Sequence, residues 1–272
     1  MAKYFTGAFG SIKALSRVKT FNKYFSLGSA LRWIIDLDGV VWKGKEIIWE
    51  NVDAIKKLEG KKVFLTNKAT SRWEVSRRLK EIGLEGEVVT SAYIASQFLK
   101  KRGVESAFAV GPSGLAEELV MAGIHLTEDE DLAQAVVAGL DAFLTYDKVA
   151  RAASMIRKGA LFVATNTDKT YPTERGLMPG AGSVVEAIRV ASGKEPVVVG
   201  KPSRHAFEVA SGGERDVIVI GDKMETDMKM ALENGARGIL VLTGVTREPP
   251  KEVPQGVTVV KTLKEVLGDE TG

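Results

Sequence analysis

Four short apolar runs in this chain are each followed at once by polar residues, and this pattern constrains the fold more than any other feature. The runs are Trp33-Ile34-Ile35, Val63-Phe64-Leu65, Val197-Val198-Val199 and Val217-Ile218-Val219-Ile220. Apolar runs of this length predict buried strands. In open α/β sheets, ligands bind outside the carboxyl ends of the strands. The sequence therefore predicts an α/β fold with a parallel sheet, whose polar strand ends meet in one site.

The first polar block contains two carboxylates of different expected roles. It reads Asp36-Leu37-Asp38-Gly39. Residues at i and i+2 of an extended segment project to the same side, so both carboxylates face one ligand. Asp36 leaves the strand first and is the candidate nucleophile, which would form an aspartyl-phosphate intermediate. Asp38 is the candidate for proton transfer to the leaving alkoxide and from the attacking water.

A phosphate dianion cannot approach an aspartate without cations, because like charges a few ångströms apart repel by roughly 4 kcal/mol at intermediate dielectric. We expect Mg²⁺ as the cofactor, held by Asp36, the backbone carbonyl of Asp38 and Asp222. Lys201 is expected to supply a second positive charge. Asp227 is expected to lie behind the metal ligands as a supporting carboxylate.

The block that follows the second run predicts a phosphate-binding loop. Thr66 and the backbone N–H groups of Asn67 and Lys68 are expected to donate hydrogen bonds to phosphate oxygens. Taken singly, each of the four blocks also fits ordinary turn or helix-cap chemistry. Their occurrence in this order, each after an apolar strand, favours a phosphoryl-transfer site.

The spacing of the blocks predicts where a second domain is inserted. Between Gly39 and Thr66 there is room only for one helix and one strand. Between Asn67 and Lys201 lies a stretch about the size of a domain. Within it we expect strands and helices to alternate. The expected strands are Ala107 to Val110, Ala135 to Ala138 and Leu161 to Ala164, and the expected helices are Leu115 to Ala122, Lys148 to Arg157 and Gly182 to Ala191.

We therefore expect three regions. They are a basic N-terminal extension (1–30), a core domain in two pieces (31–90 and 196–272), and an inserted cap domain (91–195). Such a cap would cover the carboxyl edge, exclude water and select the substrate. The segment from Thr165 to Thr173 is expected to reach toward the site, with Asp168 and Tyr171 as candidate substrate contacts.

The order of motifs, DxDG, TN, GKPS and GDxxxTD, resembles the haloacid dehalogenase superfamily of aspartate-nucleophile phosphatases. Motifs in the middle of the chain resemble its NagD-like or 4-nitrophenylphosphatase branch; they are Val136 to Asp141, Leu144 to Tyr146, Ala164 to Asp168, Tyr171 to Thr173 and Pro179 to Ser183. This resemblance implies a Rossmann-like core with an inserted α/β cap of the C2 type. Two residues depart from the usual pattern. Lys68 stands where the family usually has a second Asn, and Thr167 where it usually has Pro.

The expected function is Mg²⁺-dependent hydrolysis of a small phosphate monoester. The resemblance implies phosphoglycolate, glycerol phosphate, sugar phosphates or nucleoside monophosphates as candidate substrates, and 4-nitrophenyl phosphate as an artificial one. Two alternatives stay open. A phosphotransferase or mutase would use the same Asp36 intermediate, and a non-catalytic protein would only bind phosphate esters.

The composition of the chain indicates its cellular location and the kinds of partner it binds. The chain has 272 residues and no cysteine, and it lacks an apolar run of membrane-spanning length. We expect a cytoplasmic protein without nucleic-acid or membrane partners, and the resemblance implies a homodimer. All residues before the first strand are basic or uncharged, which also fits a targeting peptide or a binding arm. We expect a plain extension, with a helix around Phe9 to Phe25.

Overall fold

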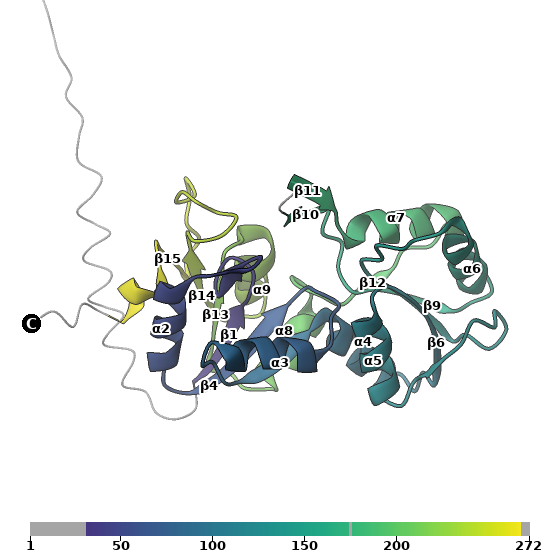
Figure 1. The fold of residues 1–272 in the computed structure, drawn as a ribbon, viewed down its shortest axis with the longest axis horizontal. Helices are drawn as coiled ribbons and strands as arrows, with labels where there is room; N and C mark the ends of the chain where they lie inside the picture. The colour runs from purple at the N-terminus through teal and green to yellow at the C-terminus, as the bar shows by residue number, and fades with distance from the viewer. Residues whose placement is uncertain (1–30, 174–175, 268–272) are drawn as a thin grey trace, which may run out of the picture.

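The computed structural model describes residues 31–173 and 176–267 and contains two parallel sheets (Figure 1). The first sheet has six strands in the order β15-β14-β13-β1-β4-β5, and all neighbouring strands are parallel. Its strands are β1 (Arg32–Asp36), β4 (Lys61–Thr66), β5 (Glu87–Thr90), β13 (Val217–Gly221), β14 (Arg237–Val241) and β15 (Val257–Val260). Three of the four apolar runs, at 33–35, 63–65 and 217–220, therefore lie in one sheet, although the expected insertion separates them in sequence.

The second sheet has five strands in the order β12-β9-β8-β6-β7, and it is parallel throughout. Its strands are β6 (Ser106–Val110), β7 (His125–Leu126), β8 (Ala135–Ala138), β9 (Leu161–Ala164) and β12 (Val197–Val198). Figure 1 shows this sheet beside the first one, with helices on both of its faces.

Helices cover both faces of each sheet, as a parallel sheet requires to bury its side chains. In β1, Trp33 and Ile35 pack on one face with residues of α2, α3 and η2, whereas Ile34 packs on the other face with residues of α4, α8 and α9. In the second sheet, α6 and α7 cover one face and α5 covers the other. The helices are α2 (Trp49–Lys57), α3 (Arg72–Glu81), α4 (Ser91–Lys100), α5 (Ser113–Met121), α6 (Tyr146–Arg157), α7 (Ala181–Ser192), α8 (Arg204–Ser211), α9 (Lys229–Glu233) and η2 (Leu263–Val266).

Helix α4 joins the two parts into one continuous apolar cluster. Phe98 and Leu99 of α4 are buried in a cluster that includes Leu65 of the first sheet and Val137 of the second. The cluster also contains Leu115 of α5. Because apolar contact runs from one sheet to the other through α4, the two parts share part of their hydrophobic core.

Two short hairpins complete the fold. β2 (Trp42–Lys43) and β3 (Glu46–Ile47) form one of them directly after the Asp36 block. β10 (Thr170–Thr173) and β11 (Gly176–Pro179) form the other, with Tyr171 opposite Met178. In Figure 1 the second hairpin lies beside α7, on the side of the second part that faces the first.

The prediction of a parallel α/β fold is confirmed, and the six elements expected within the insertion are present with ends shifted by a few residues. One expectation is wrong. The run Val197-Val198-Val199 was expected to be a buried strand of the core sheet, with the core resuming at 196. Its strand, β12, pairs instead with β9 of the second sheet. The domain boundaries themselves stay a prediction.

The carboxyl edge of the second sheet nevertheless faces the first part. A Cβ at Gly139, just after β8, would lie 3.4 Å from Ala69 Cβ, and one at Gly200, after β12, would lie 2.8 Å from Asn67 Oδ1. The block after β12 therefore reaches the same place from the opposite side.

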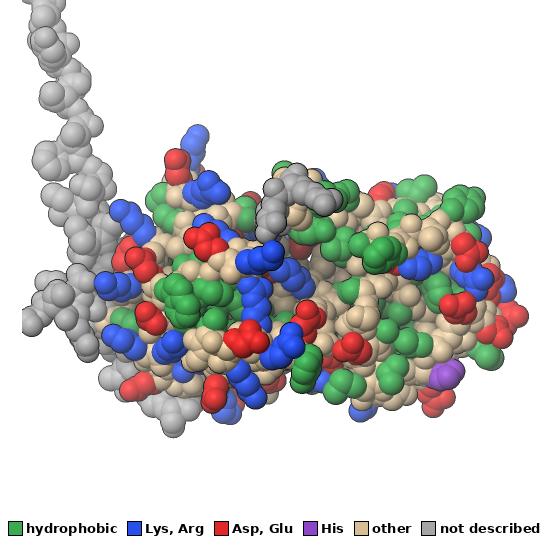
Figure 2. All heavy atoms as spheres, viewed as in Figure 1, with side chains coloured by type: hydrophobic (Ala, Val, Ile, Leu, Met, Phe, Trp, Pro, Cys, Tyr) green, Lys and Arg blue, Asp and Glu red, His purple; other side chains and the backbone are tan. Residues whose placement is uncertain are grey.

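Within the described ranges, no helix is both long and apolar enough to cross a membrane. On the face that Figure 2 shows, acidic and basic side chains are interspersed over both parts. The expected extension 1–30, with its helix around Phe9 to Phe25, lies outside the described residues.

Candidate active site

Asp36 ends the central strand β1 and meets Lys201 from the other part of the molecule. Lys201 Nζ lies 2.6 Å from Asp36 Oδ1 and 2.6 Å from Asp227 Oδ1. The Lys201 side chain is only 5% exposed, so this is a buried ion-paired group and not a solvated lysine. Breaking such a pair leaves an uncompensated buried charge, which is strongly destabilising.

Asp222 directly follows the neighbouring strand β13 and carries an unpaired buried oxygen. Its Oδ2 accepts a hydrogen bond from the Val245 N–H at 2.6 Å. Its Oδ1 is buried and has no hydrogen-bond partner among the described residues. An orphaned buried carboxylate oxygen is costly unless something pairs with it.

Two glycines allow the backbone to pass close to the Asp222 carboxylate. A Cβ at Gly244 would lie 1.9 Å from Asp222 Oδ2, and one at Gly39 would lie 2.3 Å from it. Gly39 also has a φ of +91°, a conformation that residues with a side chain rarely adopt. The Gly of the first block is therefore required by both conformation and space.

Asp227 belongs to η1 (Met224–Met228), a single π-helical turn of the kind often found at functional sites. Its Oδ1 binds Lys201, and its Oδ2 accepts hydrogen bonds from the Lys223 N–H and the Thr226 hydroxyl. Both oxygens are thus occupied. The geometry makes Asp227 a group that holds Lys201 in place.

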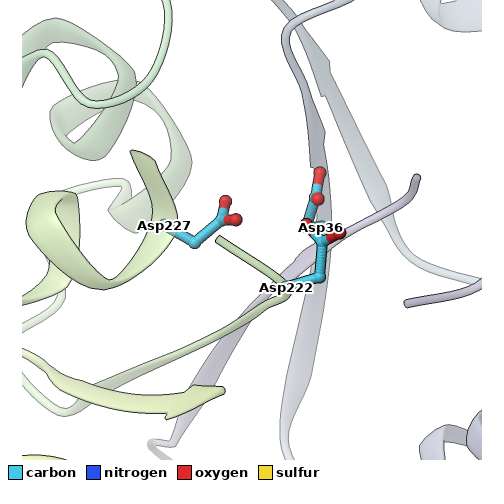
Figure 3. Close-up of side chains that lie close together, drawn as sticks. All are labelled: Asp36, Asp222 and Asp227. Atoms are coloured by element: carbon cyan, nitrogen blue, oxygen red, sulfur yellow. The ribbon is translucent and has the colours of Figure 1, made fainter. Parts of the chain in front are cut away.

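Asp36, Asp222 and Asp227 form a cluster suited to a cation (Figure 3). One carboxylate oxygen from each lies within 4.8 Å of the other two, and all three residues are buried. Figure 3 shows Asp36 and Asp222 side by side, with the Asp227 carboxylate directed toward them. Among the described residues, the Lys201 ammonium pairs with two of these three carboxylates, Asp36 and Asp227, and not with Asp222, so the cluster lacks positive charge. The orphaned oxygen of Asp222 and this charge deficit fit a hard divalent cation such as Mg²⁺.

The pKa values of the cluster are shifted by burial and by the neighbouring charges. Burial raises the pKa of Asp36 well above its ordinary value; the Lys201 charge opposes this, and Asp227 and Asp222 add to it. Burial also raises the pKa of Asp222, and the Asp227 carboxylate adds to this effect. For Lys201, burial by itself lowers the pKa, but the Asp227 and Asp36 carboxylates raise it above its ordinary value. Lys201 is therefore charged, and the carboxylates compete for too little positive charge.

Asp38 lies apart from this cluster and pairs with Lys68. Lys68 Nζ is 2.8 Å from Asp38 Oδ1, and the Asp38 side chain is 41% exposed. Its carboxylate is thus partly open to solvent, and its role in proton transfer stays a prediction. The expected metal contact through its backbone carbonyl stays a prediction.

The phosphate-loop residues differ in part from expectation. Thr66 ends β4 and is buried, and its Oγ1 accepts a hydrogen bond from the Lys68 N–H at 3.1 Å. The Lys68 N–H, expected to bind phosphate, is therefore already used in this structure. A hydroxyl can both accept and donate, so Thr66 keeps one donor for a phosphate oxygen.

The Asn67 side chain clamps the backbone of Lys201. Its Oδ1 accepts a hydrogen bond from the Lys201 N–H at 2.8 Å, and its Nδ2 donates to the Lys201 carbonyl at 3.2 Å. Asn67 Nδ2 also lies 3.4 Å from Asp168 Oδ2. The amide thus places the lysine that binds Asp36, a role that the sequence alone did not suggest.

Asn166 is a further functional candidate, which the sequence pattern alone did not indicate. Its Nδ2 donates to the Asn67 carbonyl at 2.7 Å, and its Oδ1 accepts from the Asp168 N–H at 3.0 Å. The residue stands in a motif that carried the resemblance, but no sequence pattern indicated this contact across the two parts. Tyr171, by contrast, lies half-buried on β10, and its role as a substrate contact stays a prediction.

Family models match the chain on both sides of the insertion. The haloacid dehalogenase-like hydrolase model matches residues 33–125, and the HAD-hydrolase-like model matches residues 198–266. The acid sugar phosphatase of Staphylococcus saprophyticus is 34% identical over 250 residues, which are 86% of this chain and 96% of that protein. The D-glycerol 3-phosphate phosphatase of Mycobacterium tuberculosis is 40% identical over 221 residues, which are 78% of this chain but only 63% of that protein.

Solved structures of phosphatases are similar to this chain as well. A glycerol phosphate phosphatase of M. tuberculosis in complex with magnesium has a TM-score of 0.80 and 36% identity, and the match covers 88% of this chain and 77% of that one. The p-nitrophenyl phosphatase of Archaeoglobus fulgidus has a TM-score of 0.79 and 32% identity, covering 87% and 97%. The chain belongs to the haloacid dehalogenase-like hydrolases. Within them it falls in the NagD-like, 4-nitrophenylphosphatase branch, as its motifs predicted.

Proposed function

We propose that this chain hydrolyses small phosphate monoesters with Mg²⁺ as cofactor, through a phospho-Asp36 intermediate. The observation that carries the proposal is the buried Asp36 carboxylate, held 2.6 Å from Lys201 in a cluster that lacks positive charge. The similarity to haloacid dehalogenase-like hydrolases that are named phosphatases supports phosphoric monoester hydrolysis as the class of reaction. Asp36 and Asp222, with the Asp38 carbonyl, would hold the metal.

The two aspartates of the first block divide the chemistry. The Asp36 carboxylate forms a bond to phosphorus while the bond from phosphorus to the ester oxygen breaks, and Asp38 gives its proton to that oxygen. Asp38 then takes a proton from a water, whose oxygen attacks phosphorus and releases inorganic phosphate and free Asp36. Mg²⁺, when bound, neutralises phosphate charge and orients phosphate oxygens.

The other residues of the site orient the reacting groups. Lys201 fixes the Asp36 carboxylate, and its charge lowers the repulsion between Asp36 and an incoming phosphate. Asn67 fixes Lys201 through two hydrogen bonds to its backbone. Thr66 would donate to a phosphate oxygen and stabilise charge in the transition state.

Candidate substrates are small phosphate esters: glycerol phosphate, sugar phosphates, phosphoglycolate and nucleoside monophosphates. The similarity to a glycerol phosphate phosphatase and an acid sugar phosphatase supports the first two. Tyr171 and Asp168 are proposed to contact the organic part of the substrate. Asp168 has the stronger support, because it reaches Asn67.

Three further expectations belong with this proposal. A cytoplasmic location rests on the absence of cysteine from the sequence, and a homodimer rests on the family resemblance. The division into a core of 31–90 and 196–272 and a cap of 91–195 is likewise proposed, with the change that β12 pairs in the second sheet.

The proposal is tested by phosphate release from a panel of the candidate esters and 4-nitrophenyl phosphate, with Mg²⁺ or with chelator. We expect phosphate release to require Mg²⁺. We also expect that an added alcohol does not accept the phosphoryl group in place of water. Transfer of the phosphoryl group to the alcohol would instead indicate a phosphotransferase or mutase. Absence of turnover in a folded, Mg²⁺-binding preparation would favour a binding protein and contradict the proposal.

A further inference from the structure

The site contains two cations at different depths. Lys201 is 5% exposed and lies 2.6 Å from each of two carboxylates. Lys68 is 55% exposed and lies 2.8 Å from one oxygen of Asp38. The two lysines therefore differ in their freedom to meet a substrate.

The buried Lys201 cannot leave its carboxylate partners without a large cost in free energy, whereas the exposed Lys68 can. Removing either partner from the Lys201 group leaves a buried charge without compensation. The pair between Lys68 and Asp38 is exposed, and exposed pairs contribute little because water and salt screen them. Lys68 can therefore exchange Asp38 for another anion at little cost.

The base of the Lys68 side chain is held in place. Its N–H donates to Thr66 Oγ1 at 3.1 Å. The preceding carbonyl, that of Asn67, accepts hydrogen bonds from Ser91 Oγ and Asn166 Nδ2, both at 2.7 Å. Only the flexible arm of the lysine is thus left to move, and its ammonium stays near Asp38.

The position of Asp38 indicates which part of the substrate Lys68 meets. Asp38 is the residue that we propose to protonate the ester oxygen, so a charge 2.8 Å from its carboxylate lies beside the leaving alcohol. An anionic group on that alcohol, a few bonds from the ester oxygen, would fall within reach of the Lys68 ammonium. A neutral alcohol would gain nothing from it.

We propose that Lys68 is a specificity-determining residue, which selects phosphate monoesters whose alcohol carries a second anionic group close to the ester oxygen. The proposal rests on the hydrolytic function proposed above and adds the class of substrate. When such an ester binds, the Lys68 ammonium pairs with its second anion.

The test compares 2-phosphoglycolate with 2-hydroxyethyl phosphate, in which a neutral hydroxymethyl group replaces the carboxylate. The ratio of their kcat/KM values is measured for wild type, Lys68→Met, Lys68→Arg and the control Lys80→Met. Lys80 is exposed on α3, and its replacement removes the same charge outside the site. We expect wild type to prefer the anionic ester. Lys68→Met should lose about tenfold of that preference, or about 1.4 kcal/mol, chiefly through KM.

The other readouts separate a charge effect from a structural one. Lys68→Arg and Lys80→Met should keep the preference, and added salt should weaken it in wild type because the pair is exposed. Equal activity of wild type on both esters would overturn the proposal. So would a Lys68→Met enzyme that keeps the preference, or one that slows equally on both esters. If the proposal for Lys68 fails but the neutral ester is still hydrolysed, the proposed hydrolytic function is unaffected. If no ester is hydrolysed at all, the hydrolytic function itself is contradicted.

Discussion

At the scale of single residues, the site is built around a deficit of positive charge. Asp36, Asp222 and Asp227 converge, and Lys201 alone among the described residues pairs with two of them. The orphaned Oδ1 of Asp222 marks where a cation would gain most. Burial raises the pKa values of Asp36 and Asp222, and the neighbouring carboxylates add to this effect.

The first prediction concerns pH. Because Asp36 and Asp222 have raised pKa values, the folded metal-free protein holds protons that the unfolded chain has already released. Its stability is therefore lost as pH rises from the ordinary carboxyl pKa, about 3.9, through the raised values. Mg²⁺ needs the deprotonated carboxylates, so it should stabilise the protein more at neutral than at mildly acidic pH. The measurement is the Tm of thermal unfolding with and without Mg²⁺, from mildly acidic to neutral pH. A Tm increase on adding Mg²⁺ that is the same at every pH would contradict the prediction.

The second prediction concerns Gly244. A Cβ there would lie 1.9 Å from Asp222 Oδ2, so Gly244→Ala must push Asp222 or its loop aside. We expect Mg²⁺ affinity to fall by about 10-fold or more, as for other residues that orient metal ligands. Calorimetric Mg²⁺ titration measures this, and activity at saturating Mg²⁺ should recover in large part. Unchanged affinity in a folded variant would show that Asp222 does not bind the metal.

At the scale of elements, strands were easier to predict than their partners. The run Val217 to Ile220 and the run Val197 to Val199 look alike in sequence, yet β13 lies in the first sheet and β12 in the second. Apolar pattern predicts burial in a parallel sheet but does not indicate which sheet. The segment from Thr165 to Thr173 was expected only to reach toward the site, and the pairing of its end, β10, with β11 was not predicted.

The acidic and basic residues of the candidate site could be named from the sequence because their chemistry demands those types after strand ends. The contacts that position them could not. The Asn67 side chain accepts a hydrogen bond from the Lys201 N–H, and the Asn166 side chain donates one to the Asn67 carbonyl. Both bonds join segments that are far apart in the chain. An Asn in a turn has many structural uses, so its type alone does not indicate its partner.

The third prediction tests this connection between the parts. Asn166→Asp keeps the oxygen that accepts the Asp168 N–H but loses the donor to the Asn67 carbonyl. We expect kcat to fall, by about 5- to 30-fold if the loss costs about 1–2 kcal/mol. The matched control is Asn234→Asp, which loses a similar hydrogen bond to the Met230 carbonyl outside the site. Equal kcat values for the two variants would contradict a positioning role for Asn166.

At the scale of the whole molecule, the two parts are distinct sheets that share a hydrophobic cluster through α4. Phe98 of this helix is 4% exposed and packs in the cluster that reaches both sheets. Two parts joined in this way should unfold together, since opening one exposes apolar surface of the other.

The fourth prediction is therefore cooperative unfolding. All four Trp residues lie in the first part, at Trp33, Trp42, Trp49 and Trp73. Trp fluorescence reports on that part alone, whereas far-ultraviolet circular dichroism reports on both. We expect the two signals to give coincident denaturant transitions, and Phe98→Ala to lower the free energy of unfolding by about 3–5 kcal/mol in both. Separate transitions would show that the parts unfold independently.

The most direct test of the central claim is detection of the phosphoryl group on Asp36. Wild type and Asp36→Asn are mixed with 4-nitrophenyl phosphate and Mg²⁺, quenched in acid within a turnover, and digested for mass spectrometry. We predict one phosphoryl adduct on the wild-type peptide that contains Asp36, and no adduct or turnover for the folded Asp36→Asn variant. An adduct on another residue, or substantial hydrolysis by Asp36→Asn, would contradict the assignment of Asp36 as the nucleophile.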